Sequence, residues 1–108
     1  MTVRELAERL QLTPLCVPEP DREVTGCYTG DLLSWVMGRA QSGDCWVTIM
    51  SNTNIAAVAA LADTALVVLA EGVQPDAGVK ELAERKGINL YFSEKSAYQL
   101  CAELSASL

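Results

Sequence analysis

Histidine is absent from this chain of 108 residues. Because histidine is the most common general base of enzymes, its absence excludes the histidine-dependent forms of acid–base and nucleophilic catalysis. The phosphate-binding pattern G-x-x-x-x-G-K-[ST], the dinucleotide pattern G-x-G-x-x-G and the esterase pattern G-x-S-x-G are also missing. We therefore expect a protein that is not an enzyme and that carries no cofactor.

Pairs of closely spaced cysteines are also lacking. The four cysteines, Cys16, Cys27, Cys45 and Cys101, form no C-x-x-C motif, so a structural zinc site has little support. Each lies among apolar neighbours, which favours reduced thiols that serve as small hydrophobic side chains. A redox sensor at an exposed Cys27 or Cys16 is a weaker alternative, since it needs a thiolate near a positive charge such as Arg22.

Basic residues are few and scattered. The chain has 8 Lys and Arg residues against 14 Asp and Glu, for a net charge of -6. Nucleic acids and anionic membranes bind clustered positive charge, so we expect neither as a partner. The polar N-terminus has no apolar signal segment, and no apolar run approaches the roughly 20 residues of a membrane span. These features predict one cytoplasmic domain over residues 1–108.

The hydrophobic pattern predicts alternating strands and helices. Nearly continuous apolar runs, typical of strands covered on both faces, occur at residues 45–50, 65–69 and 88–92. Helices are predicted at residues 3–12, 32–40, 55–62, 75–86 and 96–104, with Thr2 and Asp31 as caps and Gly87 as a stop signal. The alanine-rich helix 55–62 is expected to be buried. The fold class is therefore α/β, a layered and mostly parallel sheet with helices on its faces.

Two further segments are predicted to be extended. Residues 15–17 are expected to form a short extended segment between two prolines. Residues 23–29 are expected to add a strand at the edge of the sheet, and the sequence leaves open whether that strand runs antiparallel to its neighbour. Trp35 and Trp46 are expected to be core or interface residues.

Three loops are candidate ligand-binding segments, because ligands of open α/β sheets lie beyond the carboxyl ends of the strands. Their candidate residues are Ser51, Asn52, Thr53 and Asn54 in the first loop, Glu71 and Gly72 in the second, and Ser93 in the third. Free backbone N–H groups at a helix start favour an anion. Ordinary helix capping and turn formation are the alternative roles of these residues.

Arg22 is an eighth candidate, because its forked guanidinium can bind a carboxylate or a phosphate. It can equally pair with Asp21, Glu23 or Asp31 and fix the loop in which it lies.

Four segments together resemble the DRTGG domain family, over nearly the whole chain. They are residues 21–24 (DREV), 30–37 (GDLLSWVM), 43–49 (GDCWVTI) and 54–61 (NIAAVAAL). The chain looks most similar to short, stand-alone bacterial members, and the resemblance implies the fold of the N-terminal domain of HPr serine kinase. It also implies a regulatory role, homodimerisation and adenine-nucleotide sensing, without kinase activity.

The chain departs from the motif that names this family. The family's Asp-Arg aligns with Ser51-Asn52, and its Thr-Gly-Gly aligns with residues 70–72, where only Gly72 is retained. An arginine is thus lost and Glu71 is gained, which makes the position less favourable for a phosphate.

Two functions follow as alternatives. The first is a non-catalytic, homodimeric regulatory module that binds a small anionic or nucleotide ligand at the strand-end loops. The second is an interaction or scaffold subunit without a small-molecule site, for a partner kinase or redox enzyme of the kinds that the resemblance suggests.

Overall fold

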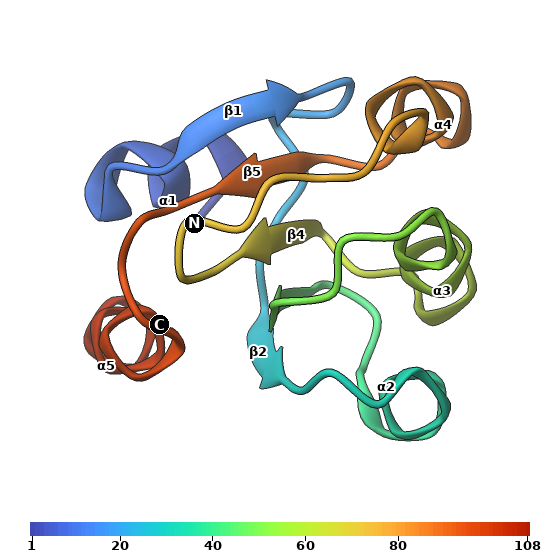
Figure 1. The fold of residues 1–108 in the computed structure, drawn as a ribbon. Helices are drawn as coiled ribbons and strands as arrows, with labels where there is room; N and C mark the ends of the chain where they lie inside the picture. Colours follow the sequence, from blue (N-terminus) through green and yellow to red (C-terminus); the bar gives the residue numbers. More distant parts are fainter.

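The apolar segments form the centre of a five-stranded sheet in the computed structural model, which describes residues 1–108 (Figure 1). The strands are β1 (Thr13–Cys16), β2 (Gly26–Thr29), β3 (Asp44–Thr48), β4 (Leu66–Leu69) and β5 (Leu90–Phe92). Their order in the sheet is β1-β5-β4-β3-β2. Strands β2 to β5 are parallel, and β1 pairs antiparallel with β5. Every residue of β3 and β4 is buried, as their nearly continuous apolar character predicts, and the buried residues include Asp44 and Thr48 at the two ends of β3.

Helices cover both faces of the sheet (Figure 1). They are α1 (Val3–Leu10), α2 (Leu33–Arg39), α3 (Asn54–Ala62), α4 (Val79–Lys86) and α5 (Ala97–Ser107). The helices α2, α3 and α4 lie on one face, and α1 and α5 lie on the other. The predicted layered α/β architecture is therefore confirmed. None of these helices combines the length and the apolar character needed to cross a bilayer.

Side chains that alternate along each strand build two separate cores. Cys45 and Val47 of β3 belong to the core beneath α1 and α5, whereas Trp46 belongs to the core beneath α2, α3 and α4. Trp46 is completely buried, and its indole Nε1 donates a 2.9 Å hydrogen bond to the Gly30 carbonyl. Trp35, in contrast, is 52% exposed. Only Trp46 is thus a core residue.

The helix signals in the sequence are largely accurate. Thr2 and Glu5 form the expected capping box at the start of α1. Gly87 ends α4 in the left-handed conformation. The start of α4 is the main difference, because Gly78 has a φ of +88°, which is incompatible with a right-handed helix, so α4 begins at Val79.

Two predicted features are wrong in detail. Asp31 does not cap α2, whose N-cap is Leu32 without a side-chain hydrogen bond; its carboxylate turns instead to the end of β3. The alanine-rich α3 is buried only on its inner face, and Leu61 on the outer face is 73% exposed.

The chain winds in one direction through strands β2, β3, β4 and β5, with each connecting helix on the same face. Strand β2 is the predicted edge strand, but it pairs parallel with β3. Its direction follows from residues 17–25, which connect β1 at one edge of the sheet to β2 at the other. Because the order of β2 to β5 never reverses, these strands contain no switch point, where α/β sheets usually have their binding crevice.

Candidate functional site at the carboxyl ends of the strands

The loops that follow β4 and β5 are in direct contact. The Gly72 N–H donates to the Ser93 carbonyl at 2.8 Å, and the Glu71 N–H donates to the Lys95 carbonyl at 2.9 Å. Both Glu71 and Gly72 are left-handed, with φ of 61° and 72°. A Cβ at residue 72 would also meet the carboxylate of Glu94, but that flexible side chain can move, so the positive φ is the main reason for glycine here.

The loop after β3 joins the same edge of the sheet. Its Ser51 carbonyl accepts a 2.8 Å hydrogen bond from the N–H of Asp76, which follows the β4 loop. The Asn52 side chain accepts from the Asn54 N–H at 2.9 Å, so it performs the capping role considered from the sequence. The N–H groups of Ser51, Asn52 and Thr53 donate to no other group of the chain. They are free donors at this edge.

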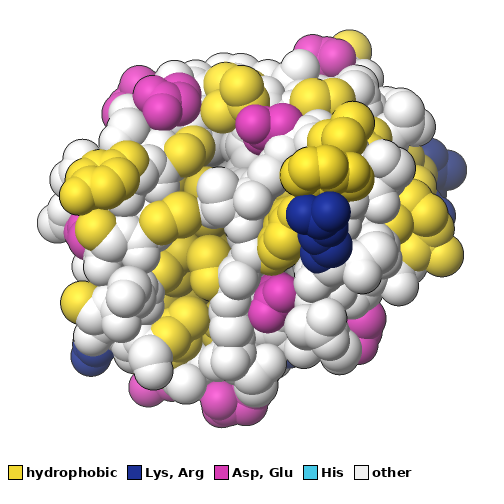
Figure 2. Space-filling view, turned by 90° about the horizontal axis from the view of Figure 1, so that it is seen from below, with side chains coloured by type: hydrophobic (Ala, Val, Ile, Leu, Met, Phe, Trp, Pro, Cys, Tyr) yellow, Lys and Arg dark blue, Asp and Glu magenta, His cyan; other side chains and the backbone are white.

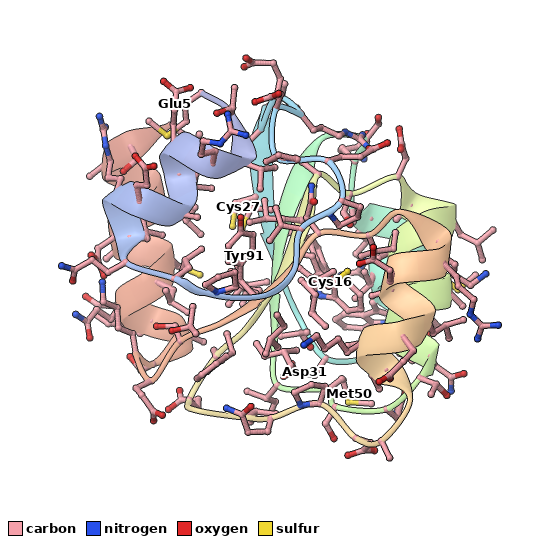
Figure 3. All side chains as sticks on the ribbon, turned by 90° about the horizontal axis from the view of Figure 1, so that it is seen from above. Glu5, Cys16, Cys27, Asp31, Met50 and Tyr91 are labelled. Atoms are coloured by element: carbon pink, nitrogen blue, oxygen red, sulfur yellow. The ribbon has the colours of Figure 1, made fainter.

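Asp31 contributes a fourth loop, which sequence reasoning missed because its position before α2 suggests a cap. Its Oδ1 accepts from the Thr48 hydroxyl at 2.8 Å and from the Ile49 N–H at 2.9 Å. The Thr48 hydroxyl in turn accepts from the Met50 N–H at 3.2 Å. Figure 3 shows Asp31 and Met50 side by side at this edge. Asp31 therefore fixes the path of the chain as it leaves β3.

The start of α5 is also tied to these loops. The Glu71 carboxylate accepts a 3.1 Å hydrogen bond from the Ala97 N–H, and Ser96 is the N-cap, accepting from the Gln99 N–H. The carboxylate of Glu71 thus lies at the positive end of the helix dipole. Ser93 does not cap the helix; its buried hydroxyl accepts from the Lys95 N–H at 3.1 Å.

Lys95 does not supply a free cation at this edge. The ammonium of Lys95 is directed to the Leu10 carbonyl and the Glu103 carboxylate, each at 2.9 Å. Glu71 and Asp76 are exposed. Backbone N–H groups and the amino end of α3 could therefore hold an anion here.

Arg22 lies at the opposite, amino edge of the sheet. Its guanidinium contacts the carboxylate and the carbonyl of Asp63, the residue that follows α3, at 2.8 Å each. The hydrogen bond from Arg22, together with one from Ser42, lowers the pKa of Asp63. The partner is therefore none of the acidic residues near Arg22 in the sequence. The other seven candidate residues do share one edge of the sheet.

The hollows of the surface lie away from this edge. One groove of about 380 Å³ runs between α1 and β1 and includes Tyr91. Another, of about 330 Å³, lies between β2 and α5 and includes Cys27 and Cys101. None of the candidate loop residues lines a hollow, which agrees with the absence of a switch point.

The structural class of this chain is defined by four parallel strands whose connecting helices all lie on one face of the sheet. An antiparallel strand at one edge and two helices on the other face complete the fold. No family model matches the sequence. Among curated proteins, likewise, none is significantly similar.

Among solved structures, the chain is similar to the CBS and DRTGG domains of the regulatory region of Clostridium perfringens pyrophosphatase, complexed with its activator diadenosine tetraphosphate. The TM-score is 0.73 at 14% sequence identity. The match covers 99% of this chain and 47% of that one, so this chain spans about half the length of its neighbour. The likeness shows a DRTGG-like fold, in agreement with the resemblance of the sequence.

Proposed function

We propose that this chain is a non-catalytic regulatory module that binds a small anionic or nucleotide ligand at the loops following β3, β4 and β5. One observation carries the proposal: the whole chain is similar in fold to about half of a regulatory region that was solved in complex with a nucleotide activator. The convergence of the three loops at one edge adds support.

The chemistry of the loops favours a ligand of low charge. The free N–H groups of Ser51, Asn52 and Thr53 can donate to a phosphate or carboxylate, and the dipole of α3 adds to their effect. The carboxylates of Glu71 and Asp76 repel each further negative charge but can accept hydrogen bonds from hydroxyl groups such as those of ribose. A nucleoside monophosphate suits this combination better than a polyphosphate.

A thermal-shift assay tests the proposal with phosphate, AMP, ATP and diadenosine tetraphosphate as probes. A ligand at 100 times its Kd stabilises the folded state by about 2.7 kcal/mol, which raises the Tm of a domain of this size by roughly 10 °C. We expect AMP to give a clear shift that Asn52→Ala reduces, because the Asn52 side chain fixes the loop that carries the free N–H groups.

Thr25→Ala is the matched control, because Thr25 is an exposed polar residue at the amino edge. Its variant should keep the full shift. Failure of all four probes to shift the Tm would refute the nucleotide-binding proposal.

A second candidate function is protein interaction without a small-molecule site. Two large apolar side chains at the start of α2, one turn apart, are about half exposed, namely Leu32 (57%) and Trp35 (52%); Met37 (52%), two residues beyond Trp35, lies on a different face of the helix. Arg39 covers one ring of this surface, with its guanidinium carbon 3.8 Å from the centroid of Trp35. Figure 2 shows apolar side chains on this side of the molecule. Clustered exposed apolar groups are typical of interfaces.

A homodimer across a two-fold axis is the simplest way to cover this surface. Sedimentation velocity of the wild type should then show a dimer, and Leu32→Glu should return it to a monomer. A wild type that stays monomeric at high concentration would contradict the dimer and direct the search to other protein partners.

A further inference from the structure

Three of the four cysteines meet on the sheet face that α1 and α5 cover. Cys27 of β2 and Cys45 of β3 are partners in the parallel register, so both side chains point to the same face. Cys101 of α5 lies over them, with its Sγ 2.9 Å from the hydroxyl of Thr29 on β2. Cys16 is on the other face, next to α4 (Figure 3).

Solvent reaches two of these three thiols. Cys27 is exposed on the edge strand and Cys101 is partly exposed, whereas Cys45 is completely buried. Cys27 and Cys101 line the groove of about 330 Å³ between β2 and α5, together with apolar residues of α5. Figure 2 shows this apolar hollow on the left, between α5 and the edge strand. A small reagent can therefore approach both sulfur atoms from the same side.

The surroundings give each thiol a different acidity. The thiols of Cys45 and Cys101 stabilise the thiolate of Cys27, which lowers the pKa of Cys27 despite its partial desolvation. The proximity of Cys27 and complete burial raise the pKa of Cys45 well above its ordinary value. Burial and the Glu84 carboxylate, 3.0 Å away, raise the pKa of Cys16 to about 12. The attacking thiol of the chain is therefore Cys27.

We propose that Cys27 and Cys101 form an oxidation-sensitive thiol pair, which a hydroperoxide converts to a disulfide that joins strand β2 to helix α5. This inference goes beyond the proposed ligand-binding function and does not depend on it.

The reaction has two balanced steps. The Cys27 thiolate attacks one oxygen of hydrogen peroxide, the O–O bond breaks, and the leaving hydroxide takes up a proton to become water. The Cys101 sulfur then attacks the sulfenic acid of Cys27, forming the S–S bond and breaking the S–O bond. The second hydroxide leaves with the proton of Cys101 as water. Two thiols are thus oxidised by two electrons while one peroxide is reduced to two waters.

Cys101 is a better resolving thiol than Cys45 for two reasons. Its position on a surface helix allows the small movement that disulfide geometry demands, whereas Cys45 is held in a central strand with no exposed atoms. The raised pKa of Cys45 also keeps its sulfur protonated and poorly nucleophilic. The resulting disulfide would close the groove and fix α5 on the edge strand.

Thiol labelling of the native, wild-type chain is the first test. At pH 8 a thiol with a pKa of about 12 is ionised only to ~10⁻⁴, against about one fifth for an ordinary exposed cysteine. The weaker nucleophilicity of the more acidic thiolate offsets part of this difference, which leaves an ordinary exposed thiol about 50-fold more reactive than Cys16, and we expect Cys27 to react in this range. Peptide mapping after brief alkylation identifies the fast site without any variant. Labelling of Cys16 as fast as that of Cys27 would overturn the assignment of the attacking thiol.

Mild peroxide treatment followed by alkylation and intact-mass measurement is the second test. We expect the loss of two thiol hydrogens, with Cys27 and Cys101 joined in the mapped peptides. Cys27→Ser and Cys101→Ser should each prevent this disulfide, while Cys16→Ser, the matched control on the opposite face, should leave it intact. A disulfide from Cys27 to Cys45, or no intramolecular disulfide at all, would refute the proposed pair. Circular dichroism of each variant verifies that it is folded.

Discussion

Asn89 connects three distant parts of the chain through one buried side chain. It precedes β5 and is only 2% exposed. Its Oδ1 accepts from the Glu19 N–H at 2.9 Å, and its Nδ2 donates to the Glu19 carbonyl at 2.8 Å and to the Ala65 carbonyl at 2.9 Å. Glu19 belongs to the segment that connects β1 to β2. Asn89 therefore holds this connection against the amino edge of the sheet.

The substitution Asn89→Ala removes all three hydrogen bonds. Each neutral hydrogen bond contributes about 1 kcal/mol net, so the expected loss is about 3 kcal/mol. A domain of this size has a total stability of roughly 5–15 kcal/mol, so this one side chain accounts for a substantial fraction of it. The Tm should fall by roughly 12 °C.

Urea denaturation followed by circular dichroism measures the change directly. Asn54→Ala is the matched control, because Asn54 is exposed at the start of α3 and its side chain holds no other part of the chain. It should change the free energy of unfolding by less than about 0.5 kcal/mol. A loss below about 1 kcal/mol for Asn89→Ala would refute the idea that Asn89 organises the β1–β2 connection.

Two further predictions concern the amino edge. Because Arg22 lowers the folded-state pKa of Asp63, their pair stabilises the fold above the unfolded pKa of about 3.9 and loses this effect as the pH falls through the lower folded pKa. The stability difference between wild type and Arg22→Gln, measured from pH 7 to pH 2, should therefore shrink at acid pH; a constant difference would contradict it. Gly43→Ala should destabilise by about 1–3 kcal/mol, and more than Gly78→Ala, because both have a φ of +88° but only a Cβ at residue 43 would collide, with Thr25. Equal losses in urea denaturation would show that the collision is relieved.

Hydrophobic pattern alone predicts the central sheet and the helices. The apolar runs of β3, β4 and β5 and the periodic spacing in α1 and α4 are local signals, so they identify these elements to within a few residues. The direction of β2 is not a local property. It depends on residues 17–25, which are fixed by contacts such as that of the Val24 N–H with the Met1 carbonyl at 2.9 Å. No local pattern in the sequence indicates such a pairing.

In the candidate site, too, some features follow from local sequence pattern and others depend on distant contacts. Its loops follow from the positions of the strand ends, which the sequence predicts. The partners of single side chains do not follow, because Arg22 pairs with Asp63, 41 residues further along the chain, and Asp31 binds the end of β3. The thiol cluster likewise depends on the register of β2 against β3. Neither the separation of the cysteines nor their apolar neighbours indicates this grouping.

The position of Arg22 gives a direct way to locate any ligand. The sequence makes Arg22 a candidate ligand-binding residue in addition to those of the strand-end loops, but the structure places it at the opposite edge of the sheet and pairs its guanidinium with Asp63. If AMP binds at the loops, Arg22→Ala should lower the Tm of the free protein and leave the AMP-induced shift unchanged, whereas Asn52→Ala should reduce that shift. The opposite result, a shift lost in Arg22→Ala and kept in Asn52→Ala, would place the ligand at the amino edge. The basis of recognition would then be a guanidinium and not backbone N–H groups.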